Sequence, residues 1–341
     1  MDPLTQGTIG AVLSQSVSKQ NTLVWATICG LIGGLAPDLD VFIRSESDPL
    51  LFLEYHRQFT HSFLFIPIGG TLVGLSLHLI LIPIKSIRTL GDVSLKTTVL
   101  YCTLGYATHA LLDSCTTYGT VLLWPFSDAR FAWNLISIID PLFTIPVFSL
   151  VVVGIILRQN KYAIIGLSWA LLYLTLGFFQ YREAIDMGHM LATNRGHTPI
   201  QIDAKPSFAN ILVWKVIYES EGRYYVDAVR VGYKPFVFEG ESIPKLDIER
   251  DFPWLDRESV QARDIERFRW FSRGYLAQHQ NFPNRIIDIR YSLVPNEINS
   301  IWSIELTPEN QTHHVSYLTH RGSISESKKK LVNMLFETRA D

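Results

Sequence analysis

The sequence predicts an α-helical membrane domain followed by a soluble α+β domain. The first observation is charge: residues 1–180 hold 9 Lys and Arg and 10 Asp and Glu, whereas residues 181–341 hold 21 and 22. The second is that all the apolar stretches close to the length of a membrane span lie in residues 1–180. Long, nearly uncharged segments are typical of membrane helices, and a dense mixture of charges is typical of a water-exposed surface. We therefore predict two domains, residues 1–180 and residues 181–341.

Four long apolar stretches are predicted to form membrane helices. Each is near the roughly 20 residues that a helix needs to cross the hydrocarbon core of a bilayer. The alternative, a buried helix of a soluble core, is stronger for residues 96–113, because this stretch carries His109 and Asp113. The four stretches are residues 62–84, 96–113, 141–157 and 162–180.

Two shorter apolar segments, residues 4–17 and 22–36, come before the long ones. Each would form a helix about 21 Å long, which is short for a membrane span. We therefore predict a hairpin packed among the longer helices. Gly33 and Gly34 would permit close packing, and Pro37 would end the second helix. In total the sequence predicts about five to six membrane helices, two of them short.

The second domain alternates strand and helix patterns. "NILVWKVIYE" and "RYYVDAVRVGY" predict paired strands around a Glu-Gly turn, and "FVFEGESIPKL" predicts an edge strand. "RESVQARDIERFRWFSRGYLAQH" predicts a helix, and "NRIIDIRYSLV" and "SIWSIEL" predict two further strands. "SISESKKKLVNMLFETR" predicts a closing helix capped by Ser323 or Ser325.

Composition argues against several classes of function. The net charge of −2 gives no support for nucleic-acid binding, which usually requires a strongly basic domain. The three cysteines are scattered, so they predict neither a disulfide framework nor a thiolate zinc site. Asp2 stands where a cleavable signal peptide would carry positive charge, so no such peptide is predicted.

Seven ionisable residues lie at the ends of the predicted membrane helices. Charge and imidazole beside lipid are costly, so such residues indicate a functional site. If the helices of residues 62–84 and 96–113 are antiparallel, all seven gather at one face of the membrane. The sequence therefore predicts a metal site built from helix ends, with these candidates: Asp38, Asp40, His56, His61, His109, Asp113 and Asp140.

The spacing of these residues suits metal ligation. His109 and Asp113 are four residues apart and would share one helix face. In an extended segment the Asp38 and Asp40 carboxylates would point the same way. The His56–His61 spacing does not fit one helix face, so we expect His56 in a loop and His61 at a helix start. Imidazole and carboxylate without thiolate favour zinc, with manganese or iron as alternatives, and six ligands leave room for two ions.

Ordered motifs in residues 1–180 resemble a known family. They are "MDPLTQGTIGAVL", "GLAPDLD", "HRQFTHS", "HALLDSCTTYGT", "LLWPFS" and "IIDPLF". Together they are similar to the YdjM-like, LexA-regulated inner-membrane metal-dependent hydrolases, and the later domain resembles a C-terminal extension found in some members. The resemblance implies a bacterial inner-membrane protein. The metal-binding set that it implies is Asp38, Asp40, His56, His61, His109 and Asp113, with Asp140 as a further carboxylate of the site.

One position departs from that family. Its opening motif typically has His after Thr, whereas Gln6 follows Thr5 here. An amide is a poor ligand for a transition metal, so the change predicts one ligand fewer, a weakly held second ion, or a variant member. More loosely, the His and Asp set is similar to zinc-dependent phospholipases C and P1-type nucleases, which implies phosphoester hydrolysis.

Positive charge predicts the orientation of the site. The face opposite the predicted site carries six basic residues before residue 181, against three on the site's own face, and the more basic face is expected in the cytoplasm. The site and the C-terminal domain would then be extracytoplasmic. The first group is Lys19, Lys85, Arg88, Lys96, Arg158 and Lys161, and the second is Arg44, Arg57 and Arg130.

These features favour a membrane-bound metal-dependent hydrolase. Asp140 or Asp40 would act as general base. Ser114 and Thr117 would supply hydrogen bonds to the substrate, or their segment is simply the turn that ends the helix. A site beside lipid favours a lipid-borne or amphipathic substrate containing an ester or phosphoester. The alternatives are a metal or proton transporter, and a non-enzymatic membrane scaffold with a structural metal. No feature of the sequence indicates an oligomeric state.

Overall fold

The computed structural model describes residues 1–91, 93–232, 234–320 and 322–336, and these form two compact units. The N-terminal unit comprises Met1–Phe42, Tyr55–Phe178 and Phe208–Asn210. The C-terminal unit comprises Ile43–Glu54, Phe179–Ser207 and the described residues from Ile211 onward. Because the division at residues 178 and 179 falls inside a continuous helix, that helix contributes residues to both units.

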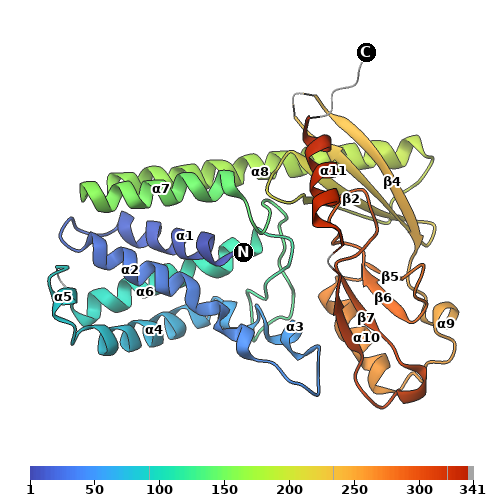
Figure 1. Cartoon of the computed structure of the whole chain (residues 1–341), viewed down its shortest axis with the longest axis horizontal. Helices are drawn as coiled ribbons and strands as arrows, with labels where there is room; N and C mark the ends of the chain where they lie inside the picture. The colour runs from blue at the N-terminus through green and yellow to red at the C-terminus, as the bar shows by residue number, and fades with distance from the viewer. Residues whose placement is uncertain (92, 233, 321, 337–341) are drawn as a thin grey trace. The chain divides into compact units, whose positions relative to one another are not determined.

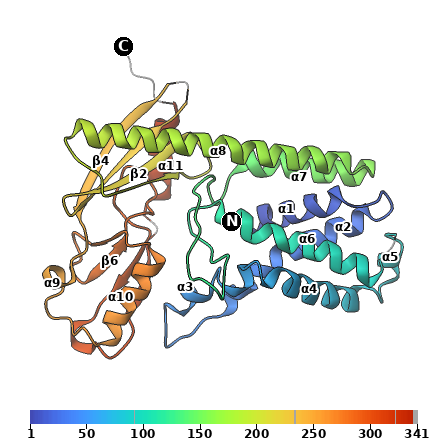
Figure 2. The same cartoon turned by 180° about the vertical axis from the view of Figure 1, so that it is seen from behind.

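The N-terminal unit is helical (Figures 1 and 2). Helices α1, α2, α4 and α6 lie side by side, and α7 runs alongside the first part of α8. Its elements are α1 (Pro3–Ser16), α2 (Leu23–Leu35), the 3-10 helix η1 (Ala36–Phe42), the 3-10 helix η2 (Phe59–His61), α4 (Phe65–Leu81), α5 (Lys85–Arg88), α6 (Leu95–Ser114), α7 (Pro141–Leu157) and the first part of α8 (Lys161–Asn194). The short helix α3 (Leu51–Tyr55) lies between η1 and η2 in the chain, and all of it except Tyr55 belongs to the C-terminal unit.

Several of these helices begin at side chains that cap their free N–H groups. Asp2 accepts a hydrogen bond from the backbone N–H of Thr5 and so starts α1. Ser94 starts α6 in the same way. Asp140 starts α7 by accepting bonds from two backbone N–H groups of its first turn. The helix α8 continues for 14 residues beyond the apolar stretch that predicted it, because the polar residues up to Asn194 stay helical.

Glycines bring α1, α2 and α6 into close contact. A Cβ atom on Gly10 would lie 2.3 Å from the carbonyl oxygen of Gly30, and one on Gly105 would lie 2.2 Å from the same oxygen. A Cβ on Gly33 would lie 2.2 Å from the carbonyl oxygen of Cys102. The helix backbones therefore touch where these side chains are missing, which is typical of membrane helix packing. The close packing expected at Gly33 and Gly34 is confirmed.

Helices α4 and α6 form an antiparallel pair, which is the condition on which the predicted metal site depends. Along the contact between them, residue numbers rise in α4 and fall in α6: Gly70 faces Thr103, and Gly74 faces Val99. The start of α4 therefore lies beside the end of α6. This arrangement brings His61, just before α4, close to the last turns of α6, where two of the predicted ligands lie.

Fewer helices are suited to cross a membrane than the five to six expected. Among the described residues, Leu23–Phe42 and α8 are long and apolar enough. Leu51–His61 with Phe65–Leu81 adds a third if this pair, bent by 85°, counts as one span. Two helices fall short in length, since α1 has 14 residues and α7 has 17. The helix α6 has 20 residues but is too polar, because it buries hydroxyl and ionisable side chains within the bundle.

The outward faces of three helices carry large apolar side chains. Such a band would be unfavourable in water and is expected where a helix contacts lipid. It therefore supports placing α4, α7 and α8 against the hydrocarbon. Examples from these helices are Leu79 and Ile80 in α4, Leu142 and Ile145 in α7, and Leu171 and Leu172 in α8.

The C-terminal unit contains two four-stranded antiparallel sheets, as an α+β domain predicts. Their strand orders are β1-β2-β3-β4 and β5-β6-β7-β8. The strands are β1 (Gln201–Pro206), β2 (Val213–Ser220), β3 (Arg223–Arg230), β4 (Phe236–Pro244), β5 (Leu276–Gln278), β6 (Arg285–Asp288), β7 (Trp302–Glu305) and β8 (Ser316–Thr319). The helices are α9 (Ile248–Asp251), α10 (Val260–Phe271) and α11 (Ile324–Phe336), with a 3-10 helix η3 (Pro308–Asn310).

The pair of strands predicted around the Glu-Gly turn and the predicted edge strand are confirmed. The turn between β2 and β3 is Glu221–Gly222, both with positive φ, and β4 lies at the edge of the first sheet. The predicted helix from residue 257 to 279 is wrong at its end. The helix stops at Phe271 because Arg273 and Gly274 turn into the left-handed region, and residues 276–278 form β5. Ser323, one of the two expected caps of α11, accepts a hydrogen bond from Glu326 N–H.

The core between the two sheets contains two buried lysines as well as apolar side chains. Ile217 and Val226 of the first sheet belong to one apolar cluster with Ala277 and Ile287 of the second. Lys205 and Lys215 are directly opposite each other on β1 and β2, and both are buried. The Lys215 ammonium donates to the Ser292 hydroxyl and the Glu297 carbonyl, whereas the Lys205 ammonium lies 4.9 Å from the centre of the Tyr291 ring.

Lys215 should make the stability of the folded protein depend on pH. Burial lowers the pKa of Lys215 from 10.5 to about 7, so between these values the unfolded chain binds one more proton than the folded one. The contribution of Lys215 to the free energy of unfolding should therefore rise with pH across this window, by at most about 1.4 kcal/mol per pH unit. We expect Lys215→Met to flatten this rise between pH 7.5 and 9.5, measured by denaturant unfolding of the full chain in detergent. The exposed Lys329→Met is the control, and an unchanged slope in Lys215→Met would contradict the prediction.

One short segment of the first half of the chain belongs to the C-terminal unit. This is residues 43–54, here called the 43–54 segment. Arg267 of α10 forms ion pairs with Asp48 and Glu54 of the segment and with Asp264 of its own helix. Phe52 packs its ring against Tyr317 at a centroid distance of 5.2 Å. The chain thus enters the C-terminal unit after Phe42 and returns to the N-terminal unit at Tyr55.

Candidate metal centre

The predicted ligands come from three separate parts of the N-terminal unit. Asp38 and Asp40 lie in η1, His61 ends η2, and His109 and Asp113 lie in the last turns of α6. The extended conformation expected for residues 38–40 is wrong, because the chain forms a 3-10 helix after α2 ends. With three residues per turn, side chains two positions apart point in different directions. Asp38 and Asp40 therefore have different partners.

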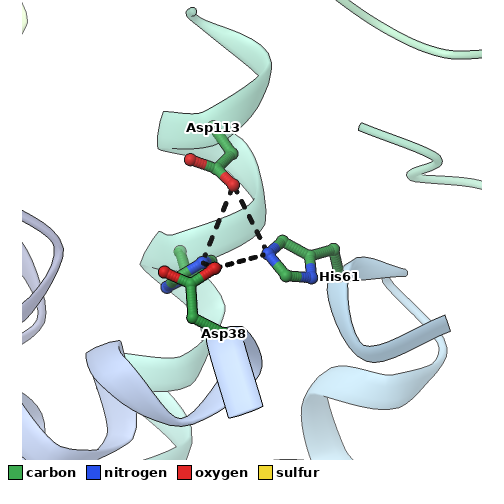
Figure 3. A group of neighbouring side chains, drawn as sticks. Asp38, His61 and Asp113 are labelled. Atoms are coloured by element: carbon green, nitrogen blue, oxygen red, sulfur yellow. Dashed lines mark ion pairs between the residues drawn. The ribbon is translucent and has the colours of Figure 1, made fainter. Parts of the chain in front are cut away.

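Four side-chain atoms meet at one point and are here called the four-ligand centre (Figure 3). They are Asp38 Oδ1, His61 Nε2, His109 Nε2 and Asp113 Oδ2, and all lie within 4.8 Å of one another. The Nε2 of His61 is 3.5 Å from the Asp38 oxygen and 3.3 Å from the Asp113 oxygen. The Nε2 of His109 is 3.3 Å and 3.7 Å from the same two oxygens.

These separations fit the shell of a metal ion better than direct hydrogen bonds. Charge-assisted hydrogen bonds between nitrogen and carboxylate are about 2.7–2.9 Å long, and all four distances are longer. A tetrahedral zinc ion with bonds of about 2.0–2.1 Å holds its ligand atoms about 3.3–3.4 Å apart. The four side chains are thus spaced to surround an ion between them.

Three of the four atoms have no hydrogen-bond partner among the described residues. They are His61 Nε2, His109 Nε2 and Asp113 Oδ2, and all three side chains are fully buried. A buried polar atom without a partner costs roughly 1–3 kcal/mol, and more when it is charged. An ion pair with Arg57 Nε at 2.9 Å offsets part of this cost for Asp113 Oδ2. The two imidazole nitrogens directed at the same point indicate that something else satisfies them. A cation is suited to that role, because it would bond to both imidazole nitrogen and carboxylate oxygen.

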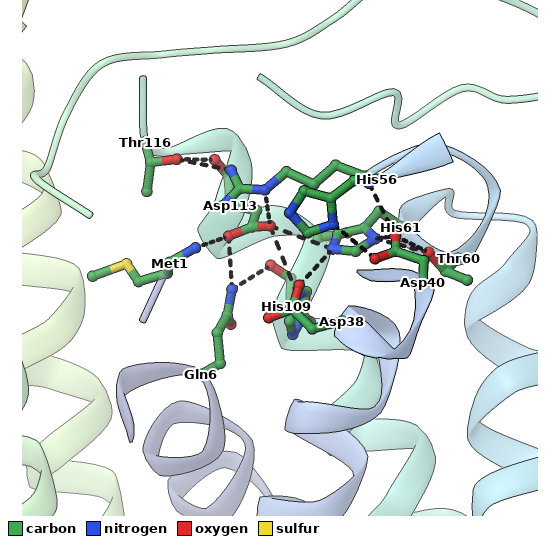
Figure 4. A network of polar contacts seen from close by, with 12 residues as sticks. Met1, Gln6, Asp38, Asp40, His56, Thr60, His61, His109, Asp113 and Thr116 are labelled. Carbon is green, nitrogen blue, oxygen red and sulfur yellow. Dashed lines mark hydrogen bonds and ion pairs between the residues drawn. The ribbon is translucent and has the colours of Figure 1, made fainter. Parts of the chain in front are cut away.

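Hydrogen bonds behind the two imidazoles direct their Nε2 lone pairs inward. The Nδ1 of His109 lies 2.6 Å from the carbonyl oxygen of Gly34, which can only accept, so this nitrogen carries the proton. The Nδ1 of His61 lies 2.9 Å from the Thr60 hydroxyl and 3.2 Å from Asp40 Oδ2 (Figure 4). Because the Thr60 hydroxyl donates its own proton to Asp40, both neighbours can only accept, and His61 Nδ1 must donate. Each Nε2 is then free to bind a metal, as in known metal sites.

The second oxygen of Asp113 is held from the other side. The Gln6 side-chain amide donates to Asp113 Oδ1 at 2.8 Å, and the Met1 amino group also contacts this oxygen. Gln6 thus supports a ligand through its N–H groups. At the position where the resembling family typically has His, Gln6 therefore fixes the orientation of Asp113.

Asp40 and His56 form a second group with Asp38, next to the first. The Nδ1 of His56 lies 2.7 Å from Asp40 Oδ1, a normal hydrogen-bond distance. Asp40 also accepts from the backbone N–H of Arg57 and from Thr60. Its carboxylate is therefore occupied by donors, and it joins His56 to the back of His61.

The remaining predicted site residues have other partners. Asp140 belongs to neither group of potential ligands among the described residues. Its carboxylate caps α7 and accepts hydrogen bonds from the Tyr173 hydroxyl at 2.9 and 3.0 Å. The buried Ser114 hydroxyl donates to the carbonyl of Ala110 in its own helix. Thr117 is also buried. For these three residues, a role in catalysis or substrate binding stays a prediction.

Arg57 is a site residue that the spacing argument missed. Its Nε lies 2.9 Å from Asp113 Oδ2, and its Nη1 donates to the Thr116 hydroxyl. The signal was present in the sequence, because Arg57 is the charged residue inside the motif "HRQFTH". The prediction counted Arg57 only among the basic residues that indicate the orientation of the protein in the membrane.

Comparison with known proteins places the N-terminal part of the chain in a family. The family model for the YdjM inner membrane protein matches residues 1–184, which is more than half of the chain. The chain belongs to the YdjM inner membrane protein family. The match covers α1 to α7, the first part of α8 and every residue of the four-ligand centre. No curated protein and no solved structure matches the chain.

Proposed function

We propose that this YdjM family member is a membrane-bound metal-dependent hydrolase that cleaves an ester or phosphoester. The observation that carries the proposal is the four-ligand centre, where the Nε2 atoms of His61 and His109 are buried and lack a hydrogen-bond partner among the described residues. Catalytic metal sites keep a coordination position for water or substrate besides their protein ligands, whereas structural sites are closed. Here Asp38 has 26 % of its side chain exposed while the other three ligands have none, so the proposal places this additional position on the Asp38 side.

The four residues Asp38, His61, His109 and Asp113 would hold one divalent cation. The mixture of imidazole and carboxylate favours zinc, with manganese or iron as alternatives. When bound, such an ion supplies a Lewis acid and lowers the pKa of water. Charge supports the assignment: the three carboxylates of Asp38, Asp40 and Asp113 outnumber the two cationic groups beside them, Arg57 and the Met1 amino group.

We assign proton transfer to the Asp40–His56 pair. Asp40 binds the Nδ1 proton of His56, which leaves His56 Nε2 to accept or return a proton. The His56 side chain is 18 % exposed, so it has access to solvent. Asp40 thus acts through His56, rather than as the base itself. A second ion at Asp38, Asp40 and His56 would require this hydrogen bond to open.

Exposed apolar side chains next to the ligands support a lipid-borne or amphipathic substrate. Leu39 lies between the two aspartates of η1 and Phe42 follows them, while Phe63 and Leu64 follow His61; all four are exposed. Apolar side chains at the opening of a polar centre suit a molecule with a polar head and an apolar chain. The excess of basic residues on the opposite face supports an extracytoplasmic site.

Hydrolysis by the zinc-loaded protein tests the proposal. Purified full-length protein in detergent would be assayed against bis(p-nitrophenyl) phosphate and a short-chain phospholipid. We expect turnover by the wild type and a loss of at least about 100-fold in kcat/KM for His109→Ala, because this variant removes a ligand. The matched control is His78→Ala, since His78 lies in α4 and in neither ligand group among the described residues.

Two results would contradict the proposal. Wild-type protein that takes up zinc and hydrolyses neither substrate would show that the centre is not hydrolytic towards phosphoesters or lipids. Zinc flux into vesicles by such protein would favour transport instead. Equal hydrolysis by the wild type and His109→Ala would show that the activity arises elsewhere.

A further inference from the structure

Arg57 is held at the four-ligand centre at some cost to the backbone. Its φ is 66°, in the left-handed region that long side chains rarely adopt. Its N–H donates to Asp40, and its carbonyl accepts from Val121 N–H at 2.9 Å, so the conformation is fixed from both sides. Strained residues persist where the surrounding structure enforces them, and they cluster at functional sites. Here the strain directs a cationic side chain into the protein, where it is 5 % exposed.

The Arg57 guanidinium keeps hydrogen-bonding capacity beside the ligands. It has five N–H donors, and Nη1 donates to Thr116 at 3.3 Å. Its Nε is near Asp113 Oδ2 but is fully buried without a hydrogen bond of good geometry among the described residues. If Asp113 Oδ2 binds a cation, its charge is shared with that cation. The ion pair between the guanidinium and Asp113 is then weaker, and the guanidinium can bind another anion.

A second guanidinium lies on the same aromatic ring. Arg57 Cζ is 4.7 Å from the centre of the Tyr118 ring, and Arg130 Cζ is 5.6 Å from it. Arg130 Nη2 donates to the Gly119 carbonyl at 2.8 Å, which holds it there. Two guanidinium groups therefore lie close to Tyr118, and one of them contacts a ligand of the centre.

We propose that Arg57, supported by Arg130 and Tyr118, binds an anionic phosphoryl group of the substrate at the four-ligand centre. The inference rests on the proposed function and narrows its substrate class from esters in general to phosphoesters. The planar guanidinium presents paired donors that match the oxygens of a phosphoryl group, and stacking on Tyr118 holds that plane in place. A phosphoryl group brings negative charge to these donors, whereas a neutral carboxylic ester brings none.

The test measures phosphate binding to the zinc-loaded full chain in detergent. Inorganic phosphate would be titrated by calorimetry into the wild type, Arg57→Gln and Arg57→Lys. The control is Arg257→Gln, which removes an exposed arginine paired with Glu249 in the C-terminal unit. We expect Arg57→Gln to weaken phosphate binding at least about tenfold and Arg57→Lys to restore part of it. A second titration, with phosphatidic acid in mixed micelles, shows whether the protein binds the phosphoryl group as free phosphate or as part of a lipid.

Zinc affinity separates this role from a structural one. Removal of a positive charge next to Asp113 should leave zinc affinity unchanged or raise it, whereas a merely structural Arg57 would lower it on removal. Unchanged phosphate binding in Arg57→Gln, or loss of zinc from Arg57→Gln and Arg57→Lys alike, would overturn the inference. Zinc-loaded wild type that binds neither phosphate nor phosphatidic acid would overturn it and leave the metal centre standing. A wild type that takes up no zinc would overturn the proposed function and this inference together.

Discussion

His109→Ala is expected to lower the affinity for zinc by roughly 100- to 1,000-fold. Binding of a structural zinc ion is worth about 10–16 kcal/mol, so one of four ligands accounts for about 2.5–4 kcal/mol. His109 is fully buried, and its Nε2 has no other partner among the described residues, so no neighbouring group replaces it. Competition with a chromophoric chelator would give the affinities of the wild type and the variant in detergent.

The control for this measurement is His78→Ala. The Nδ1 of His78 lies 3.5 Å from the Thr98 hydroxyl, away from the ligand groups, so its removal should leave zinc affinity within about twofold of the wild type. Zinc binding of equal strength in all three proteins would show that the four-ligand centre does not hold the ion.

Asp40→Ala is expected to lower zinc affinity by about 10- to 100-fold, the range seen when the group behind a metal-bound histidine is removed. Asp40 holds the proton on His61 Nδ1 and so keeps Nε2 available for the ion. Without it, Thr60 alone fixes the imidazole, and the wrong tautomer becomes populated. The zinc affinity of Asp40→Asn should fall between those of the wild type and Asp40→Ala, because the amide oxygen can still accept the hydrogen bond from His61 Nδ1.

The size of the Asp40 effect distinguishes two roles. If Asp40 were itself a ligand, as the sequence suggested, its loss should match that of His109→Ala. A smaller loss, with one zinc ion per chain in both wild type and variant, would place it behind His61. An affinity unchanged in Asp40→Ala would contradict both roles. Zinc content by elemental analysis gives the stoichiometry.

The parts of the centre that follow helix geometry could be predicted from sequence. The spacing of His109 and Asp113 placed both on one face of α6, and the antiparallel pairing of α4 and α6 brought His61 to them. The hairpin of β2 and β3 was likewise predictable, since Glu221 and Gly222 form a turn between two apolar runs. In each case the information is local, or depends on one pairing of neighbouring elements.

The rest depended on contacts between distant residues. That His109 Nδ1 bonds to the carbonyl of Gly34 requires α2 and α6 to touch, which glycines allow but do not specify. Asp140 lies immediately before a helix that begins with proline, where an aspartate most often serves as a cap. The helix α6 was overrated as a span because its polar side chains face the bundle, and their cost in lipid depends on that packing.

The 43–54 segment means that the two units cannot be separated by a single cut in the gene. A fragment that ends near residue 180 would still carry Asp48 and Glu54 but would lack Arg267, their partner. Without Arg267 the segment would lose its ion pairs, although it connects directly to potential metal ligands at both ends, Asp40 before it and His56 after it. Anyone who wishes to study the metal centre alone should replace residues 43–54 with a short linker, instead of simply deleting the C-terminal half.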